Sequence, residues 1–189
     1  MIHIIEFRNP IQKTARESVQ SKKCAFTGHR PQNLPFGFDE SDERCIALKS
    51  AMQDRIVALI ENEGITHFIT GMALGVDIFA AEIVLNLKAK YPHIILESAI
   101  PCETQAVKWS VAAQERYYSI AAKCDKETML QRKYTPDCME KRNKYMVDNS
   151  NYILAVWNGG RGGTGSTVKY ARSKGKLIIV IDPVSLTVK

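Results

Sequence analysis

The sequence predicts an α/β protein built on a Rossmann-like, doubly wound and mostly parallel β-sheet, with helices on both faces. Two observations predict this class. From Lys23 onward, short apolar runs alternate with stretches of helical periodicity, which is the order that successive βαβ units require. The last apolar run, residues 177–181, contains no polar residue, as expected of a parallel strand that is buried on both faces.

Each helix is predicted from apolar residues that recur every three or four positions, as Cys45, Leu48 and Met52 do. Gly64 follows the first helix, where a glycine commonly ends one, and Thr135 precedes Pro136 as the predicted cap of the fourth. The predicted strands cover residues 24–27, 67–70, 94–100, 127–130, 152–157 and 177–181, and the predicted helices cover residues 41–62, 75–90, 109–124, 135–149 and 165–173.

Residues 23–189 are predicted to form a single domain, because a chain of 189 residues suits one hydrophobic core. Residues 1–22 do not fit the alternation and are predicted to be an N-terminal extension, for which an edge strand, an oligomer arm and a mobile segment stay open. No apolar run approaches the ~20 residues of a membrane span, and no signal peptide is visible. The five cysteines are scattered and odd in number, which favours reduced thiols and a cytoplasmic location.

The formal net charge of +6 suits a phosphorylated or acidic partner. The basic residues form no long tract, so nucleic acid ranks behind a small nucleotide-like molecule as the predicted partner. No membrane partner is predicted, and a homo-oligomer stays open. The four histidines, which lack the spacing of metal ligands, are His3, His29, His67 and His93. We therefore predict no metal and no other cofactor.

The segment after the first predicted strand has the composition of a ligand-binding loop. Open parallel sheets bind ligands at the carboxyl ends of their strands. Gly28 stands at this end and permits close approach of the backbone, and His29 and Arg30 follow with groups that can hold an anion. The alternative is an ordinary strand exit with an exposed histidine and arginine.

A second candidate segment joins the second predicted strand to its helix. Gly71 and Gly75 bracket this turn, and the N–H groups and dipole of the following helix favour negative charge there. Asp77 lies in the first turn of that helix. It either complements the helix dipole, accepts hydrogen bonds from ribose hydroxyls or activates water.

A third candidate segment is rich in glycine, with five glycines in residues 159–165. Backbone amides in such a turn can converge on a phosphate, and nearby hydroxyls add further contacts. The segment is neither a Walker loop nor a G-x-G-x-x-G motif after the first strand. Its predicted ligand contacts are Gly160, Gly162, Gly163, Thr164, Gly165 and Ser166. Arg142 and Asn143, on the preceding predicted helix, either reach over the ligand or lie on a solvated face.

The chain resembles the SLOG superfamily, and most closely its YpsA-like branch. The resemblance lies in the order of three segments, which are Gly28-His29-Arg30-Pro31, the turn from Gly71 to Asp77 and the late glycine-rich turn. The resemblance covers roughly residues 23–183. It implies a Rossmann-like fold with a pocket for nucleotides or their derivatives, such as ADP-ribose-like molecules, and it does not imply an enzyme. In this branch the second turn characteristically carries Gly-x-Glu/Asp, which falls here on Gly75 and Asp77.

The related LOG group hydrolyses cytokinin riboside monophosphates, and its motif contains a helix with an arginine and then Pro-Gly-Gly-x-Gly-Thr-x-x-Glu. Arg142 lies on a segment similar to that helix, and Gly163-Thr164 matches the Gly-Thr. Thr167 occupies the position of the catalytic glutamate, and the proline is missing. The stretch after Gly165 looks more like DprA, a relative that binds single-stranded DNA, although the extra domains of DprA are absent from this sequence.

Three functional hypotheses follow. The first is a binding or sensing module for a nucleotide-like ligand, since phosphate-cradling backbone is abundant and no catalytic dyad is obvious. The second is an N-glycoside hydrolase, in which Asp77 activates water or stabilises an oxocarbenium-like centre and Arg142 clamps the phosphate. The third, ranked last, is a module that binds single-stranded nucleic acid through its positive charge.

Overall fold

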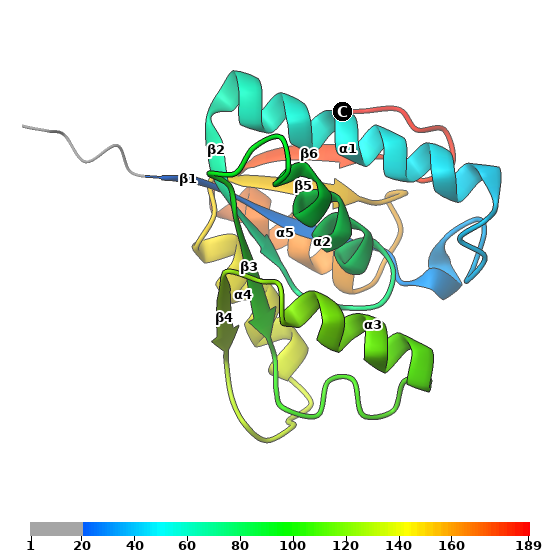
Figure 1. Ribbon diagram of the computed structural model, residues 1–189, viewed down its shortest axis with the longest axis vertical. Helices are drawn as coiled ribbons and strands as arrows, with labels where there is room; N and C mark the ends of the chain where they lie inside the picture. Colours follow the sequence, from blue (N-terminus) through cyan, green and yellow to red (C-terminus); the bar gives the residue numbers. More distant parts are fainter. Residues whose placement is uncertain (1–20) are drawn as a thin grey trace, which may run out of the picture.

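The predicted α/β fold is confirmed in a computed structural model, which describes residues 21–189. Within these residues one sheet contains all six predicted strands, and its order is β4-β3-β2-β1-β5-β6, with every neighbouring pair parallel (Figure 1). The strands are β1 (Lys22–Gly28), β2 (Ile65–Thr70), β3 (Ile95–Ile100), β4 (Lys126–Met129), β5 (Tyr152–Val156) and β6 (Leu177–Ile181).

Five α-helices in the described residues cover the two faces of this sheet. From β1 to β4 the chain moves in one direction across the sheet, so the right-handed rule for parallel crossovers places α1 to α3 on one face. The chain then returns past β1 to β5 and β6, which places α4 and α5 on the other face (Figure 1). The helices are α1 (Glu43–Glu63), α2 (Val76–Leu87), α3 (Val111–Ala121), α4 (Cys138–Asp148) and α5 (Gly163–Ser173).

Successive side chains of β1 point to opposite faces of the sheet and so pack in two separate hydrophobic clusters. Phe26 packs in the larger cluster beneath α1 to α3, whereas Ala25 packs in the smaller cluster beneath α4 and α5. The smaller cluster is rich in alanine, and small side chains let helices approach a sheet closely; it includes Ala25, Ala99, Ala155 and Ala171.

The change of direction makes β1 and β5 neighbours, with Gly28 opposite Val156 at their carboxyl ends. The loops after these two strands lead to opposite faces of the sheet. In an open parallel sheet such a switch point leaves a crevice at the carboxyl edge, where ligands bind. The strand order therefore places the first and third candidate segments on the two sides of one crevice.

Several predicted boundaries move by a few residues. Gly64 ends α1 in the left-handed conformation (φ 68°), as predicted. The fourth helix begins at Cys138, so the prediction that Thr135 caps it was wrong. The Thr135 hydroxyl instead donates to Asp137 Oδ1 (2.6 Å), which forms a turn before the helix. No helix in residues 21–189 is long and apolar enough to span a membrane.

One antiparallel pairing adjoins the parallel sheet, because the last residues of the chain run antiparallel to β6. Val180 and Lys189 exchange two backbone hydrogen bonds of 2.9 Å, and Ile181 forms an antiparallel bridge with Val188. This pairing covers one edge of the sheet. The predicted extension at residues 1–22 lies almost wholly outside the described residues, which begin at Ser21, and β1 begins at Lys22.

Gly28 allows α2 to begin directly against the end of β1. A Cβ added at Gly28 would overlap the Cβ and Cγ1 of Val76, and a rotation of that side chain cannot relieve the overlap because the Cβ is fixed by the backbone of α2. We expect Gly28→Ala to lower the free energy of unfolding by about 2–3 kcal/mol, as overpacking does. Urea unfolding measures this. Gly163→Ala is the control, since its Cβ enters open space and its φ is not positive; an equal or larger loss there would contradict the prediction.

Candidate functional site

A pocket of about 270 Å³ lies at the switch point. The loop after β1 forms one wall, the turn before α2 forms a second, and the glycine-rich turn with α4 closes the rest. Nine of the predicted ligand residues line it: Gly28, His29, Arg30, Asp77, Arg142, Asn143, Gly162, Gly163 and Thr164. Segments that are far apart in the chain therefore meet around one cavity.

The first two candidate segments are joined by their backbones. The N–H of Val76 donates to the carbonyl of His29 (3.4 Å). Gly75 has a φ of 91°, which favours glycine, and a Cβ there would lie 2.7 Å from the same carbonyl. Gly75 thus brings the turn before α2 against the loop after β1 and does not itself line the pocket.

His29 joins the first segment to the third. His29 is 7% exposed, and its Nε2 lies 3.0 Å from Asn158 Oδ1 and 3.3 Å from the backbone nitrogen of Asn158. In one tautomer Nε2 donates to the side chain, and in the other it accepts from the backbone. Either way the imidazole is held as a bridge between the loops that follow β1 and β5.

Arg142 crosses the crevice from α4 to the turn before α2. Its side chain is almost fully buried, and Nη1 donates to the carbonyl of Gly71 and lies 3.8 Å from Asp77 Oδ2. Its Nε donates to Asn143 Oδ1 (2.8 Å), which fixes the other edge of the guanidinium. Gly71 lies directly beneath this group, since a Cβ there would overlap Nη1 and Cζ of Arg142.

Asp77 is a buried carboxylate that helps to shape the same turn. Its Oδ2 accepts from the N–H of Ala73 (3.4 Å), and its backbone carbonyl accepts from the Thr70 hydroxyl (2.9 Å). Burial raises the pKa of the Asp77 carboxyl, because Arg142 at 3.8 Å offsets only part of the lost hydration. A ligand hydroxyl that donates a hydrogen bond to the Asp77 carboxylate would replace part of the hydration that the group loses on burial.

The glycine-rich turn presents backbone donors to the pocket. The Trp157 indole N–H donates to the Gly160 carbonyl (2.8 Å), and Gly165 packs so closely that a Cβ would lie 2.8 Å from that oxygen. Gly160 and Gly165 therefore shape the turn and do not line the pocket. Among the described residues no side chain caps α5, as is also true of α2 and α4, whereas Asp42 caps α1 and Ser110 caps α3. The first N–H groups of α5 are thus available to an anion.

Charge in the pocket is strongly unbalanced. Three arginines line it, Arg30, Arg142 and Arg161, against the single carboxylate of Asp77. Arg30 is close enough to lower the pKa of Asp77 through its charge. The combination of guanidinium groups with an uncapped helix N-terminus favours a bound anion with several oxygen atoms.

A larger groove of about 620 Å³ runs between α4 and α5 and shares Met139, Asn143 and Gly163 with the pocket. Ser166, the remaining predicted contact, lines this groove and not the pocket. Thr167 lies there as well, and its hydroxyl donates to the Gly163 carbonyl (2.9 Å). The position that carries a glutamate in the LOG group thus holds a hydroxyl that is already engaged with the backbone.

Sequence reasoning missed several residues of the site. Gln32 and Asn33 line the pocket from a short 3-10 helix (Pro31–Asn33), which has no periodicity to reveal it. Gln105 comes from the loop after β3, and its Nε2 donates to the carbonyls of Gly71 (3.1 Å) and Met72 (2.8 Å). The other lining residues missed are Phe26, Thr27, Ala73, Met139 and Arg161. Of these, Arg161 had a visible signal as the only charge within the glycine-rich turn.

A model of the YspA SLOG family matches residues 24–179. A UPF0398 protein of Halalkalibacterium halodurans is 31% identical over 147 residues, which cover 77% of each chain. The UPF0398 protein YpsA of Bacillus subtilis is 28% identical over 139 residues, covering 72% of this chain and 76% of the relative. The prophage-derived protein YoqJ of Bacillus subtilis is 36% identical over 138 residues, covering 64% of this chain and 80% of the relative.

Two solved structures of DNA processing protein A (DprA) have the same fold. For the Streptococcus pneumoniae protein the TM-score is 0.59 at 16% identity, with 86% of this chain and 51% of that chain covered. For the Helicobacter pylori protein the TM-score is 0.57 at 17% identity, with 85% and 65% covered. This chain therefore spans about half the length of the Streptococcus protein. At these identities the likeness concerns the fold.

We expect Gly71→Ala to disturb the site while leaving the protein folded. The new Cβ would overlap the guanidinium of Arg142 and lie 2.7 Å from Asp77 Oδ2. Both groups end side chains that can move, so we expect a loss of unfolding free energy below about 2 kcal/mol. Arg142 should leave the Gly71 carbonyl, and a crystal structure of the variant would show this. An unmoved Arg142, or a variant that does not fold, would contradict the prediction.

Proposed function

Because this chain belongs to the YspA SLOG family, we propose that its arginine-lined pocket binds the phosphate and sugar of a nucleotide or nucleotide derivative, as a sensing or regulatory module. The observation that carries the proposal is the convergence of three arginines, an uncapped helix N-terminus and one buried carboxylate on a single cavity. Guanidinium groups and backbone amides suit phosphate oxygens, and the carboxylate suits sugar hydroxyls.

In this proposal, different residues of the pocket contact the phosphate and the sugar of the ligand. Arg30 and Arg142 hold the phosphate from the side of β1 and α4, and the N–H groups of Gly163 and Thr164 hold it from α5. Asp77 accepts hydrogen bonds from the sugar. A volume near 270 Å³ is at the small end of ligand pockets, which supports a single nucleotide unit inside it.

The contacts of the site favour binding over N-glycoside hydrolysis. Asp77 already accepts from the backbone and lies beside Arg142, and Thr167 has no carboxylate to offer. A catalytic role for Asp77 would require that base release from AMP be abolished in Asp77→Ala.

Calorimetry with AMP, ADP, ADP-ribose and NAD tests the proposed function. We expect saturable binding of at least one, and we expect Arg142→Ala to weaken it by about tenfold to a hundredfold, since a hydrogen bond to a charged group contributes about 1.5–3 kcal/mol. Arg55→Ala is the matched control, because this exposed arginine lies on α1 and does not line the pocket. If none of the four compounds binds, or if both variants bind equally, the proposal fails.

One observation favours a second candidate, single-stranded nucleic acid. The loop before α4 carries Arg132, Lys133 and Tyr134 in succession, and Tyr134 is 62% exposed. An exposed aromatic ring among basic residues is the usual platform for stacking an unpaired base. The DprA of Helicobacter pylori, which shares this fold, binds single-stranded DNA.

Fluorescence anisotropy with a labelled ten-residue oligothymidylate tests this second candidate. If single strands bind, Tyr134→Ala should weaken binding by about fivefold to a hundredfold through lost stacking. The affinity should also fall linearly with salt on a logarithmic scale as counterions are released. A flat salt dependence, or an unchanged affinity in the variant, would remove this candidate.

A further inference from the structure

Helix α4 carries three residues of the pocket but has few apolar anchors. Met139, Arg142 and Asn143 line the pocket from its first half. Its buried apolar residues are Cys138, in its first turn, and Met146 and Val147, in its last turn; of these, Met146 and Val147 pack in the cluster beneath α4 and α5. Between Cys138 and Met146 the only buried residue of α4 is Arg142, so polar contacts position this middle part of the helix.

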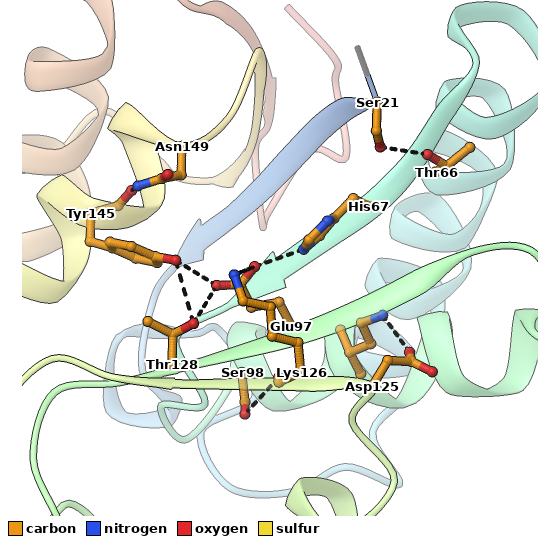
Figure 2. A network of polar contacts seen from close by, with 11 residues as sticks. Ser21, Thr66, His67, Glu97, Ser98, Asp125, Lys126, Thr128, Tyr145 and Asn149 are labelled. Carbon is orange, nitrogen blue, oxygen red and sulfur yellow. Dashed lines mark hydrogen bonds and ion pairs between the residues drawn. The ribbon is translucent and has the colours of Figure 1, made fainter. Parts of the chain in front are cut away.

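The sheet beneath α4 contains a buried glutamate. Glu97 lies in the middle of β3 with none of its surface exposed, and four side chains meet its carboxylate (Figure 2). His67 Nε2 lies 2.7 Å from Oε2, and the Lys126 ammonium lies 3.0 Å from the same oxygen. The hydroxyls of Thr128 (2.8 Å) and Tyr145 (2.7 Å) donate to Oε1.

These contacts keep Glu97 charged. Burial by itself would raise the pKa of the carboxyl, but the hydrogen bonds from His67, Tyr145 and Thr128 outweigh it and hold the pKa well below its usual range. Since an ionised carboxylate only accepts, every one of these partners donates. Such a buried charge adds little net stability compared with an apolar side chain, and its best attested contribution is to specify one arrangement.

Three of the four donors come from strands, and Tyr145 alone comes from a helix. The Tyr145 hydroxyl is thus the contact through which this carboxylate holds α4. Tyr145 follows Arg142 by one turn, so the two side chains lie on neighbouring parts of one helix face. In the sheet, Glu97 is paired with Ile69, two residues before Gly71. The two polar anchors of α4 are therefore adjacent on both the helix and the sheet.

We propose that Tyr145, held by Glu97, is a positioning residue that sets the place of Arg142 in the pocket. The inference rests on the proposed function only for its effect on ligand binding. The effect on Arg142 itself is a property of the free protein. Without the hydroxyl, the middle of α4, which carries Arg142, can shift on the sheet, and the guanidinium loses its alignment with the Gly71 carbonyl.

The first test needs no ligand. Arg142 Nε–H is buried and donates to Asn143, so its NMR signal is protected from exchange and reports its position. We expect Tyr145→Phe and Glu97→Gln each to shift or broaden this signal. Tyr152→Phe is the matched control, since it removes a similar bond, to Glu63 (2.5 Å), on the other side of the sheet. An unchanged Arg142 signal in Tyr145→Phe would overturn the inference, whatever its melting temperature.

The second test uses AMP as the probe. We expect Tyr145→Phe to weaken binding by about twofold to tenfold, the net effect of one hydrogen bond. The effect should vanish in an Arg142→Lys background, because a positioning residue acts through the group that it places. An equal loss in both backgrounds would overturn the inference. Failure of the wild-type protein to bind AMP would count against the proposed function, and the NMR test would still decide the role of Tyr145.

Discussion

The guanidinium group of Arg142 ties the two faces of the sheet together at the carboxyl edge. It extends from α4, on one face, to the carbonyl of Gly71, in the turn that leads to α2 on the other. A doubly wound sheet is open at its switch point, because the chain leaves β1 and β5 in opposite directions. The buried arginine lies across that crevice and lines the pocket, and it supplies part of the pocket's positive charge.

The hydrogen bond from Arg142 to the Gly71 carbonyl also accounts for the residue types around it. Gly71 has no side chain beneath the guanidinium, and Gln105 donates to the same carbonyl from the loop after β3. Asp77 balances part of the positive charge from the first turn of α2. Arg30 and Arg161 line the pocket as well, and no second carboxylate in the lining balances their charge.

The alternation of apolar strands and periodic helices was enough to predict the class of fold, because each signal is local. The contacts of His29 with Asn158 and of Arg142 with Gly71 depend on the strand order and were not predicted. The carboxyl-edge rule and the family resemblance predicted only that the candidate segments contribute to one ligand site. Glu97 was not singled out, since a charged residue within an apolar run has no periodicity that announces its partners. Thr135 was misassigned because a threonine before a proline suits a turn as well as a cap.

The uncapped start of α5 carries a consequence for relatives that share this architecture. Main-chain amides grip an anion in the same way whatever side chains surround them, provided that the glycines keep their conformations. If the pocket holds a phosphate as proposed, this grip is indifferent to the molecule to which the phosphate is attached. Discrimination among ligands then resides in the side chains at the rim, Gln32, Asn33, Met139 and Arg161. Proteins that keep the bends and vary these four positions would share an anchor while recognising different molecules.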